Sequence, residues 1–331
     1  MFRGCLIYTS ALTVFWLVST LGGDGGGRFF GNYALDAAAL GRITAGFLIF
    51  QILWGLVWWA IKNRLLRTVV GLSPEERRQA FSSRMSAPYP LPHLLSRYSE
   101  RRIRIVDMIG RRGRFVFILA AGLFFLYLQV REKPEPNFVT LFLNDNLVDG
   151  IVFSWLNLAL FYSSGFVARM FFGAQTRIMD GTLGRANCLL IATLWSAFKF
   201  VLVPIGERLA TLYPPEAFAS LFVVIWGSYA AADSMSEIVG SLFGRQRLRV
   251  WGIGDVNRKS VAGTVAGFVA SLALCLGIVA ANGISPSWIA LSVVVSLSNT
   301  TLELLSPRGT DDFTMATANA LICWAFGALI W

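Results

Sequence analysis

The fold is decided by the stretch GRQRLRVWGIGDVNRKSVAGTVAGF (residues 244–268), in which a basic, glycine-punctuated loop runs directly into an apolar segment. That segment continues to about residue 281, close to the ~20 residues that a helix needs to cross a bilayer. Similar apolar runs recur along the chain, so we expect an all-α, polytopic integral membrane protein with about nine transmembrane helices. The expected spans are residues 4–22, 39–61, 114–130, 149–170, 187–205, 217–241, 261–281, 286–302 and 314–331.

Composition supports this class. Of 331 residues, 55% are hydrophobic and 15% are charged, and the mean hydropathy is +0.60. Soluble domains carry roughly 25% charged residues. A transmembrane β-barrel would show alternating segments of about ten residues instead, and the sequence has none.

The positive charges are concentrated in loops that alternation places on one side of the membrane. Residues 62–114 hold thirteen of the 29 Lys and Arg residues, so this segment is expected to be cytoplasmic by the positive-inside rule. The N-terminus and the loops at 169–186, 242–260 and 303–313 then face the cytoplasm as well. The opposite loops hold only four basic residues, Arg28, Arg131, Lys133 and Arg208. We therefore attribute the net charge of +10 to membrane topology and to contact with membrane lipids, and we expect no nucleic-acid partner.

This topology predicts three parts. Residues 1–61 form an N-terminal transmembrane hairpin, because residues 1–23 lack a convincing signal-peptide cleavage site. Residues 62–113 form a basic cytoplasmic loop. Residues 114–331 form a seven-helix region whose catalytic part is 217–331. The stretch HLLSRYSERRIRIVDMIGRRGRF (residues 93–115) fits either a solvated loop or a basic amphipathic helix on anionic headgroups.

Charged residues inside apolar segments are the first candidates for function, because charge in the hydrocarbon region is costly. Asp233 and Glu237 are four residues apart, which places them on one helix face about 6 Å apart along the axis. Two like charges there repel unless a cation lies near them; interhelical hydrogen bonds are the alternative. Lys199 is a third intramembrane charge, which can either snorkel or pair with a carboxylate.

The basic turn ends in Asn257, Arg258, Lys259 and Ser260, immediately before an apolar helix. Asn257 or Ser260 can cap that helix, whose N-terminal N–H groups and positive dipole end suit a polyphosphate. Two pairs of glycines, Gly240 with Gly244 and Gly263 with Gly267, have the spacing of close helix packing.

Three further carboxylates flank the last cytoplasmic loop, ELLSPRGTDDFT (residues 303–314): Glu303, Asp311 and Asp312. One of the aspartates can cap the following helix, but capping does not account for all three. Oxygen ligands of this kind suit Mg²⁺ bridging nucleotide phosphates. By contrast, the single histidine, His93, excludes a histidine-rich metal site.

Three pieces of the C-terminal half together resemble the polyprenol kinase family. They are ADSMSEIVGSLFG (residues 232–244), NRKSVAG (257–263) and LELLSPRGTDDFT (302–314). This group includes dolichol kinases, phytol kinases and CTP-dependent diacylglycerol kinases, and it is distantly related to phosphatidate cytidylyltransferases. Ala232 and Ala262 stand where the family often has Gly and Glu.

The resemblance implies a Mg²⁺-dependent kinase that uses CTP, ATP or another nucleoside triphosphate to phosphorylate a lipid alcohol at the cytoplasmic face. Residue roles follow from the matching positions. The resemblance implies that Asp233, Asp311 and Asp312 bind the metal and the phosphates, and that Glu303 orients the site. It also implies nucleotide-phosphate binding by Gly244, Asn257, Arg258, Lys259 and Ser260. Glu237 or one of the paired aspartates is a candidate base.

Two other functions remain open at this point. The enzyme alternative is a cytidylyltransferase that makes a CDP-lipid. The non-enzyme alternative is a transporter or a non-catalytic membrane subunit whose acidic residues line an ion path.

Overall fold

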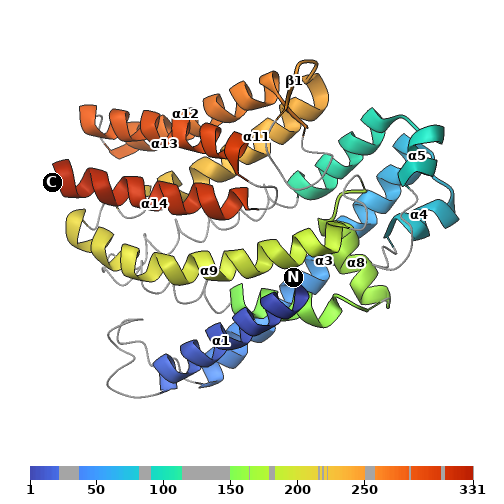
Figure 1. Cartoon of the computed structure of the whole chain (residues 1–331), viewed down its shortest axis with the longest axis horizontal. Coiled ribbons are helices and arrows are strands. Elements are labelled where there is room, and N and C mark those ends of the chain that lie inside the picture. Colours follow the sequence, from blue (N-terminus) through green and yellow to red (C-terminus); the bar gives the residue numbers. More distant parts are fainter. Residues whose placement is uncertain are drawn as a thin grey trace. The chain divides into compact units, whose positions relative to one another are not determined.

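The computed structural model describes residues 1–21, 37–81, 91–113, 150–163, 165–178, 183–214, 217, 220–221, 223–249, 258–282, 285–306 and 310–330. These residues are helical apart from short connections and one small hairpin, as the sequence predicts (Figure 1). The span expected at 114–130 lies outside the described residues. The chain divides into two compact units, the first within Met1–Val18, Ala34–Val116 and Val148–Ser196, the second mainly Ala197–Trp331.

The first unit is built from helices on both sides of the basic segment. Its elements are α1 (Phe2–Leu21), α3 (Ala37–Leu65), η2 (Leu66–Val70), α4 (Pro74–Phe81), α5 (Leu91–Arg97), a helix at 100–113, a helix at Gly150–Leu160, α8 (Phe166–Gln175) and the first half of α9 (Leu183–Leu212). The turn after η2 requires Gly71, which has a φ of 88°, a value that favours glycine.

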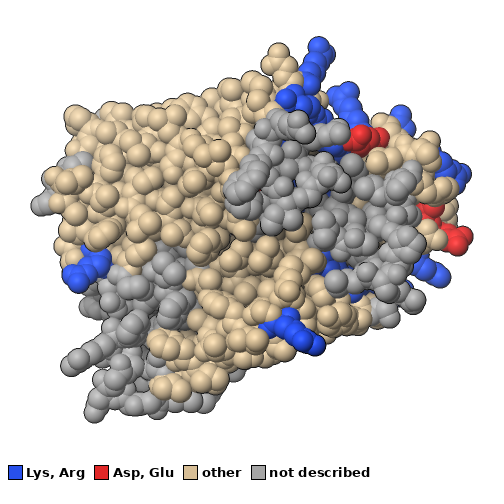
Figure 2. All heavy atoms as spheres, viewed as in Figure 1, with Lys and Arg blue, Asp and Glu red and all other residues tan. Residues whose placement is uncertain are grey.

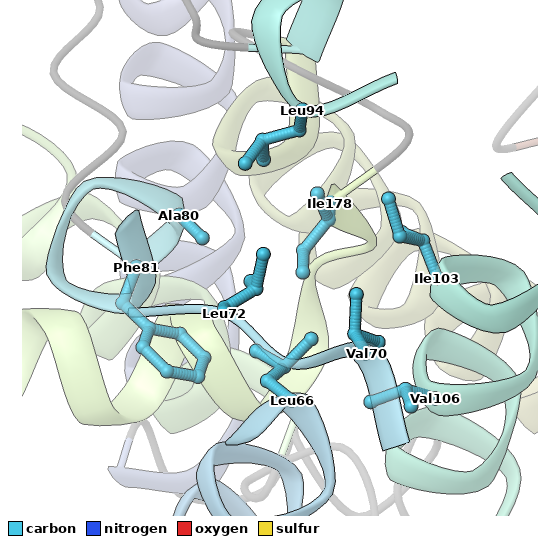
Figure 3. Close-up of a cluster of buried hydrophobic side chains, with 9 residues drawn as sticks. All are labelled: Leu66, Val70, Leu72, Ala80, Phe81, Leu94, Ile103, Val106 and Ile178. Atoms are coloured by element: carbon cyan, nitrogen blue, oxygen red, sulfur yellow. The ribbon is translucent and has the colours of Figure 1, made fainter. Parts of the chain in front are cut away.

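The basic segment is not simply a solvated loop. Nine buried side chains form a hydrophobic core beneath it: Leu66, Val70, Leu72, Ala80, Phe81, Leu94, Ile103, Val106 and Ile178. Figure 3 shows these side chains pointing toward one another from several elements. Ile103 and Val106 of the helix at 100–113 thus pack against protein, so part of the apolar face of this helix is covered.

A single helix over 149–170 was expected, and this prediction is wrong. The helix ends at Leu160 and α8 begins at Phe166, with Gly165 at its N-cap position. Arg185 explains how the break is tolerated: its Nη1 donates to the carbonyl oxygens of Phe161 at 2.9 Å and Ser163 at 2.8 Å. These bonds satisfy carbonyls that a helix end leaves without partners. Arg185, which the topology placed in the cytoplasmic loop at 169–186, is buried.

The second unit contains η5 (Val223–Gly227), α11 (Ser228–Phe243), α12 (Val261–Asn282), α13 (Pro286–Leu305) and α14 (Asp311–Ile330), with the second half of α9. Figure 1 shows α11 to α14 side by side in one bundle. The basic loop between α11 and α12 carries two short antiparallel strands that were not predicted from the sequence, β1 (Arg247–Arg249) and β2 (Arg258–Ser260), with Leu248 opposite Lys259. The strand β2 runs into α12 without a linker.

The seam between α11 and α12 is as close as the glycine spacing predicts. A Cβ atom on Gly263 would lie 2.5 Å from the Ser236 carbonyl oxygen and 3.1 Å from the Gly240 Cα. A Cβ on Gly267 would lie 2.9 Å from the Ala232 carbonyl oxygen. The two backbones therefore touch, as in other small-residue helix pairs.

Among the described residues, two segments are long and apolar enough to cross a bilayer, Val261–Ala280 and Pro286–Leu305; Phe2–Val18 and Gly150–Leu160 are shorter apolar helices. Only 22% and 33% of the two long segments is buried. The core helix of a soluble protein would be mostly buried, so this outward-facing apolar surface is typical of contact with lipid. In Figure 2 most of the described surface carries neither acidic nor basic groups; Lys and Arg side chains lie near the β1–β2 hairpin at the top of the view and at several other places on this face.

Candidate functional site

The candidate site lies at the end of the second unit where α11 ends, the β1–β2 hairpin closes and α13 ends. Helix α11 supplies Asp233 and Ser236, both buried, and the half-buried Glu237. Because Asp233 and Ser236 are three residues apart, they lie on neighbouring positions of one helix face.

Glu303 is the centre of the site. It lies in the last turn of α13, and its side chain is 2% exposed. Its Oε1 accepts hydrogen bonds from the Ser236 hydroxyl and from Lys259 Nζ, the latter at 2.7 Å. Helix α11, strand β2 and helix α13 thus meet at one carboxylate oxygen.

Lys259 is the positive charge of the site and is 24% exposed. Burial lowers the pKa of its ammonium group. The negative charges of Glu303, Asp311 and Asp233 outweigh burial, so the pKa is raised above its ordinary value. Lys259 therefore stays protonated at neutral pH, in contact with Glu303 and within electrostatic range of Asp311 and Asp233.

Ser260 begins α12. Its Oγ accepts a hydrogen bond from the Gly263 backbone N–H at 3.1 Å, so the predicted helix cap is confirmed for Ser260. Gly244 packs against the same residue: a Cβ atom there would lie 2.6 Å from Ser260 Oγ. Gly244 thus has a packing role, and its predicted contact with phosphate stays a prediction.

Asp311 and Asp312 lie in the first turn of α14, which begins three residues earlier than expected. They are in the helix rather than ahead of it, so they stand at its positive dipole end, which favours carboxylates. Ser306 Oγ and Thr314 Oγ1 are 2.5 Å apart and tie this turn to the end of α13.

Three predicted positions cannot be placed at this site. Asn257 lies outside the described residues, and so do the side chains of Arg258 and Lys199, although Arg258 is in β2 and Lys199 is in α9.

The sequence reasoning missed Ser236 and a buried polar network in the bundle. Asn299 Nδ2 donates to Ser228 Oγ at 3.0 Å and to Ser271 Oγ at 3.1 Å, and Asn319 Nδ2 donates to Asn299 Oδ1 at 2.9 Å. A signal was present: Asn299 stands one helical turn before Glu303 in an apolar segment. The network joins α11, α12, α13 and α14 and fixes the rotation of the helix that carries Glu303.

A metal site is not preformed in the described part of the chain: no three or more His, Cys, Asp or Glu side chains there form a group that could hold an ion. Mg²⁺ is usually bound by one or two carboxylates together with substrate phosphates. The carboxylates near Lys259 therefore fit Mg²⁺ only in the presence of a phosphate ligand.

Comparison with known proteins agrees with the resemblance in the sequence. Over 140 residues the chain is 29% identical to a phytol kinase from Synechocystis sp., an alignment that covers 42% of this chain and 55% of the relative. The chain is thus similar to a member of the polyprenol kinase family over part of its length. It spans about half the length of the curated relative that it matches. No family model matches the chain, and no solved structure matches it.

Proposed function

We propose that the chain is a membrane-embedded kinase that transfers the terminal phosphate of CTP, or of another nucleoside triphosphate, to a lipid alcohol. The acceptor class is an isoprenoid alcohol or diacylglycerol. The observation that carries the proposal is the meeting of Ser236, Lys259 and Glu303 at one buried carboxylate oxygen, in a chain similar to a phytol kinase.

The proposed architecture has about nine transmembrane spans, of which the one at 149–170 is interrupted after Leu160. The N-terminus, the basic segment 62–113 and the loops of the site face the cytoplasm, where nucleotides are available. The acceptor enters sideways from the bilayer, so that only its hydroxyl reaches the interface. Residues 217–331 then form the catalytic part of the seven-helix region that follows the basic segment.

Phosphoryl transfer requires mainly positioning and charge stabilisation. Lys259 and Arg258 supply positive charge, and the backbone N–H groups that open α12 after Ser260 offer donors to phosphate oxygens. Asn257 and Gly244 border the same turn. Asp233, Asp311 and Asp312 would hold Mg²⁺, which when bound neutralises negative charge on the transferred phosphate.

The test is a product assay. Protein purified in detergent is incubated with Mg²⁺, labelled CTP or ATP, and a panel of lipid alcohols. A kinase forms a phosphorylated lipid and releases the nucleoside diphosphate. Release of pyrophosphate with a CDP-lipid would instead identify a cytidylyltransferase, and no turnover with any acceptor or donor would favour a transporter or a non-catalytic subunit.

A further inference from the structure

The two oxygens of the Glu303 carboxylate have different surroundings. Oε1 accepts from both Ser236 and Lys259, whereas Oε2 is buried and has no hydrogen-bond partner. A buried carboxylate oxygen without a donor is destabilising. Such an atom therefore indicates a partner that binds at this position.

Two kinds of partner can complete a carboxylate oxygen, a cation or a hydrogen-bond donor. Lys259 Nζ already lies 2.7 Å from Oε1 of the same group. The carboxylate thus already has one cationic partner, and a divalent cation on Oε2 would add a second positive charge to the same group. An uncharged donor adds no such charge, so a hydroxyl fits Oε2 better than a metal ion does.

We propose that Glu303 Oε2 accepts the proton of the lipid alcohol hydroxyl during transfer; this inference rests on the proposed function. The hydroxyl oxygen then forms a bond to the terminal phosphorus of the nucleoside triphosphate. The bond from that phosphorus to the bridging oxygen breaks, and its electron pair leaves with the nucleoside diphosphate. The proton on Glu303 passes to water after the phosphorylated lipid departs.

The surroundings of Glu303 on α13 suit a lipid acceptor. Glu303 points into the bundle, while Leu297 and Leu305 on the same helix are 52% and 60% exposed. A long alkyl chain can therefore lie against the outer surface of α13 while its hydroxyl turns inward at the helix end. The roles of Ser236 and Lys259 are to position the carboxylate and to favour its ionised form against the effect of burial.

The decisive variant is Glu303→Gln, which keeps the size of the side chain and removes its basicity. We expect kcat to fall about 100-fold or more, the usual contribution of a general base, with KM for the nucleotide changed less than about twofold. An acceptor fluorinated beside its hydroxyl carries a more acidic proton. The variant should lose less activity with this acceptor than with the unfluorinated alcohol, a pattern that a purely structural defect would not produce.

A second variant, Ser236→Ala, tests positioning. Loss of the donor to Oε1 should raise the pKa of the base, so the acid limb of the pH profile of kcat/KM should move to higher pH. Ser234→Ala is the matched control, because Ser234 is also buried on α11 and its Oγ has no hydrogen-bond partner. This control should keep the wild-type profile.

The outcomes separate the two proposals. If the wild-type chain phosphorylates lipid alcohols and Glu303→Gln keeps more than a tenth of kcat, the role of Glu303 is overturned while the kinase assignment stands. A selective loss of nucleotide binding in Glu303→Gln would also overturn it, because the residue would then act on the donor. If the wild-type chain transfers no phosphate, both proposals fail together.

Discussion

Lys62 Nζ and Asp107 Oδ1 form an ion pair of 2.9 Å in which each side chain is only 2% exposed. Lys62 also donates to the Thr176 carbonyl oxygen at 2.6 Å. One lysine at the end of α3 thus holds both the helix at 100–113 and the residue that follows α8. The contacts join segments that are distant in sequence beneath the basic surface of the first unit.

Removing one partner of this pair should be costly. Asp107→Ala leaves a buried ammonium group without its counter-ion, and we expect a loss of about 3–5 kcal/mol in the free energy of unfolding. Thermal unfolding in detergent measures the effect. Arg64→Ala is the control, because Arg64 is exposed two residues away. The double variant Lys62→Met/Asp107→Leu should lose less unfolding free energy than Asp107→Ala. An equal or greater loss of unfolding free energy would contradict this account.

The contact between α11 and α12 predicts a position-specific effect of a single methyl group. Gly263→Ala places a Cβ atom 2.5 Å from the Ser236 carbonyl oxygen, so the helices must separate, at a cost of about 1–3 kcal/mol. Gly277→Ala adds the same group to the same helix where no atom lies within 4 Å. Gly263→Ala should lower the unfolding temperature and any kinase activity, whereas Gly277→Ala should leave both unchanged. Equal behaviour of the two would show that the seam is looser than described.

Glu76 predicts a pH dependence for the start of α4. The Ser73 backbone N–H donates to Glu76 Oε2 at 2.8 Å, and the Glu76 N–H donates to Ser73 Oγ at 3.2 Å, which together form a capping box. The hydrogen bond from Ser73 lowers the pKa of Glu76; burial raises it, but further hydrogen bonding and the charge of Arg97 make the net shift downward.

A lowered pKa stabilises the folded state above the pKa of the unfolded chain, about 4.3. The contribution is lost as the pH falls through the lower pKa of the folded state. Glu76→Gln should therefore speed amide hydrogen exchange in α4 at pH 7, by an amount that corresponds to about 1 kcal/mol. The difference should shrink as the pH falls below about 4. Glu75→Gln, at an exposed position in the same turn, should change little at either pH, and a pH-independent effect of Glu76→Gln would refute the argument.

The polar network predicts that Asn299 matters more than its surroundings suggest. Asn299→Ala removes donors to Ser228 and Ser271 and leaves Asn319 Nδ2 without one of its acceptors. We expect a loss of about 1–3 kcal/mol and lower activity, because α13 can then rotate and carry Glu303 away from Ser236. Thr301→Ala, on the exposed face of the same helix, is the control. Unchanged unfolding in Asn299→Ala would mean that packing alone fixes α13.

Much of the helical pattern was predictable, because apolar runs such as 261–282 and 286–305 leave few alternatives to a helix. The break after Leu160 was not, since it depends on Arg185 reaching back to carbonyls about twenty residues earlier. The β1–β2 hairpin escaped detection because strands of three residues are fixed by their pairing and have too few residues for a periodic signal.

The candidate site was likewise predictable from the sequence only in part. Carboxylates in an apolar chain stand out, so Glu303 and Asp233 were found from sequence. Ser236 was missed because serine is common on membrane helices, and only its contact with Glu303 gives it a role. That Oε2 of Glu303 lacks a partner is a property of three-dimensional packing that the sequence does not record.

Because Gly240 and Gly263 have no side chains, nothing separates the backbones of α11 and α12 at this point, and this limits how the two helices can move. Because their backbones are in contact, α11 and α12 have no side chains between them that could repack. Ser236 on α11 and Ser260 at the start of α12 are therefore expected to move together. Any movement that opens the site around Glu303 is therefore expected to come from α13 and α14, which carry Glu303, Asp311 and Asp312.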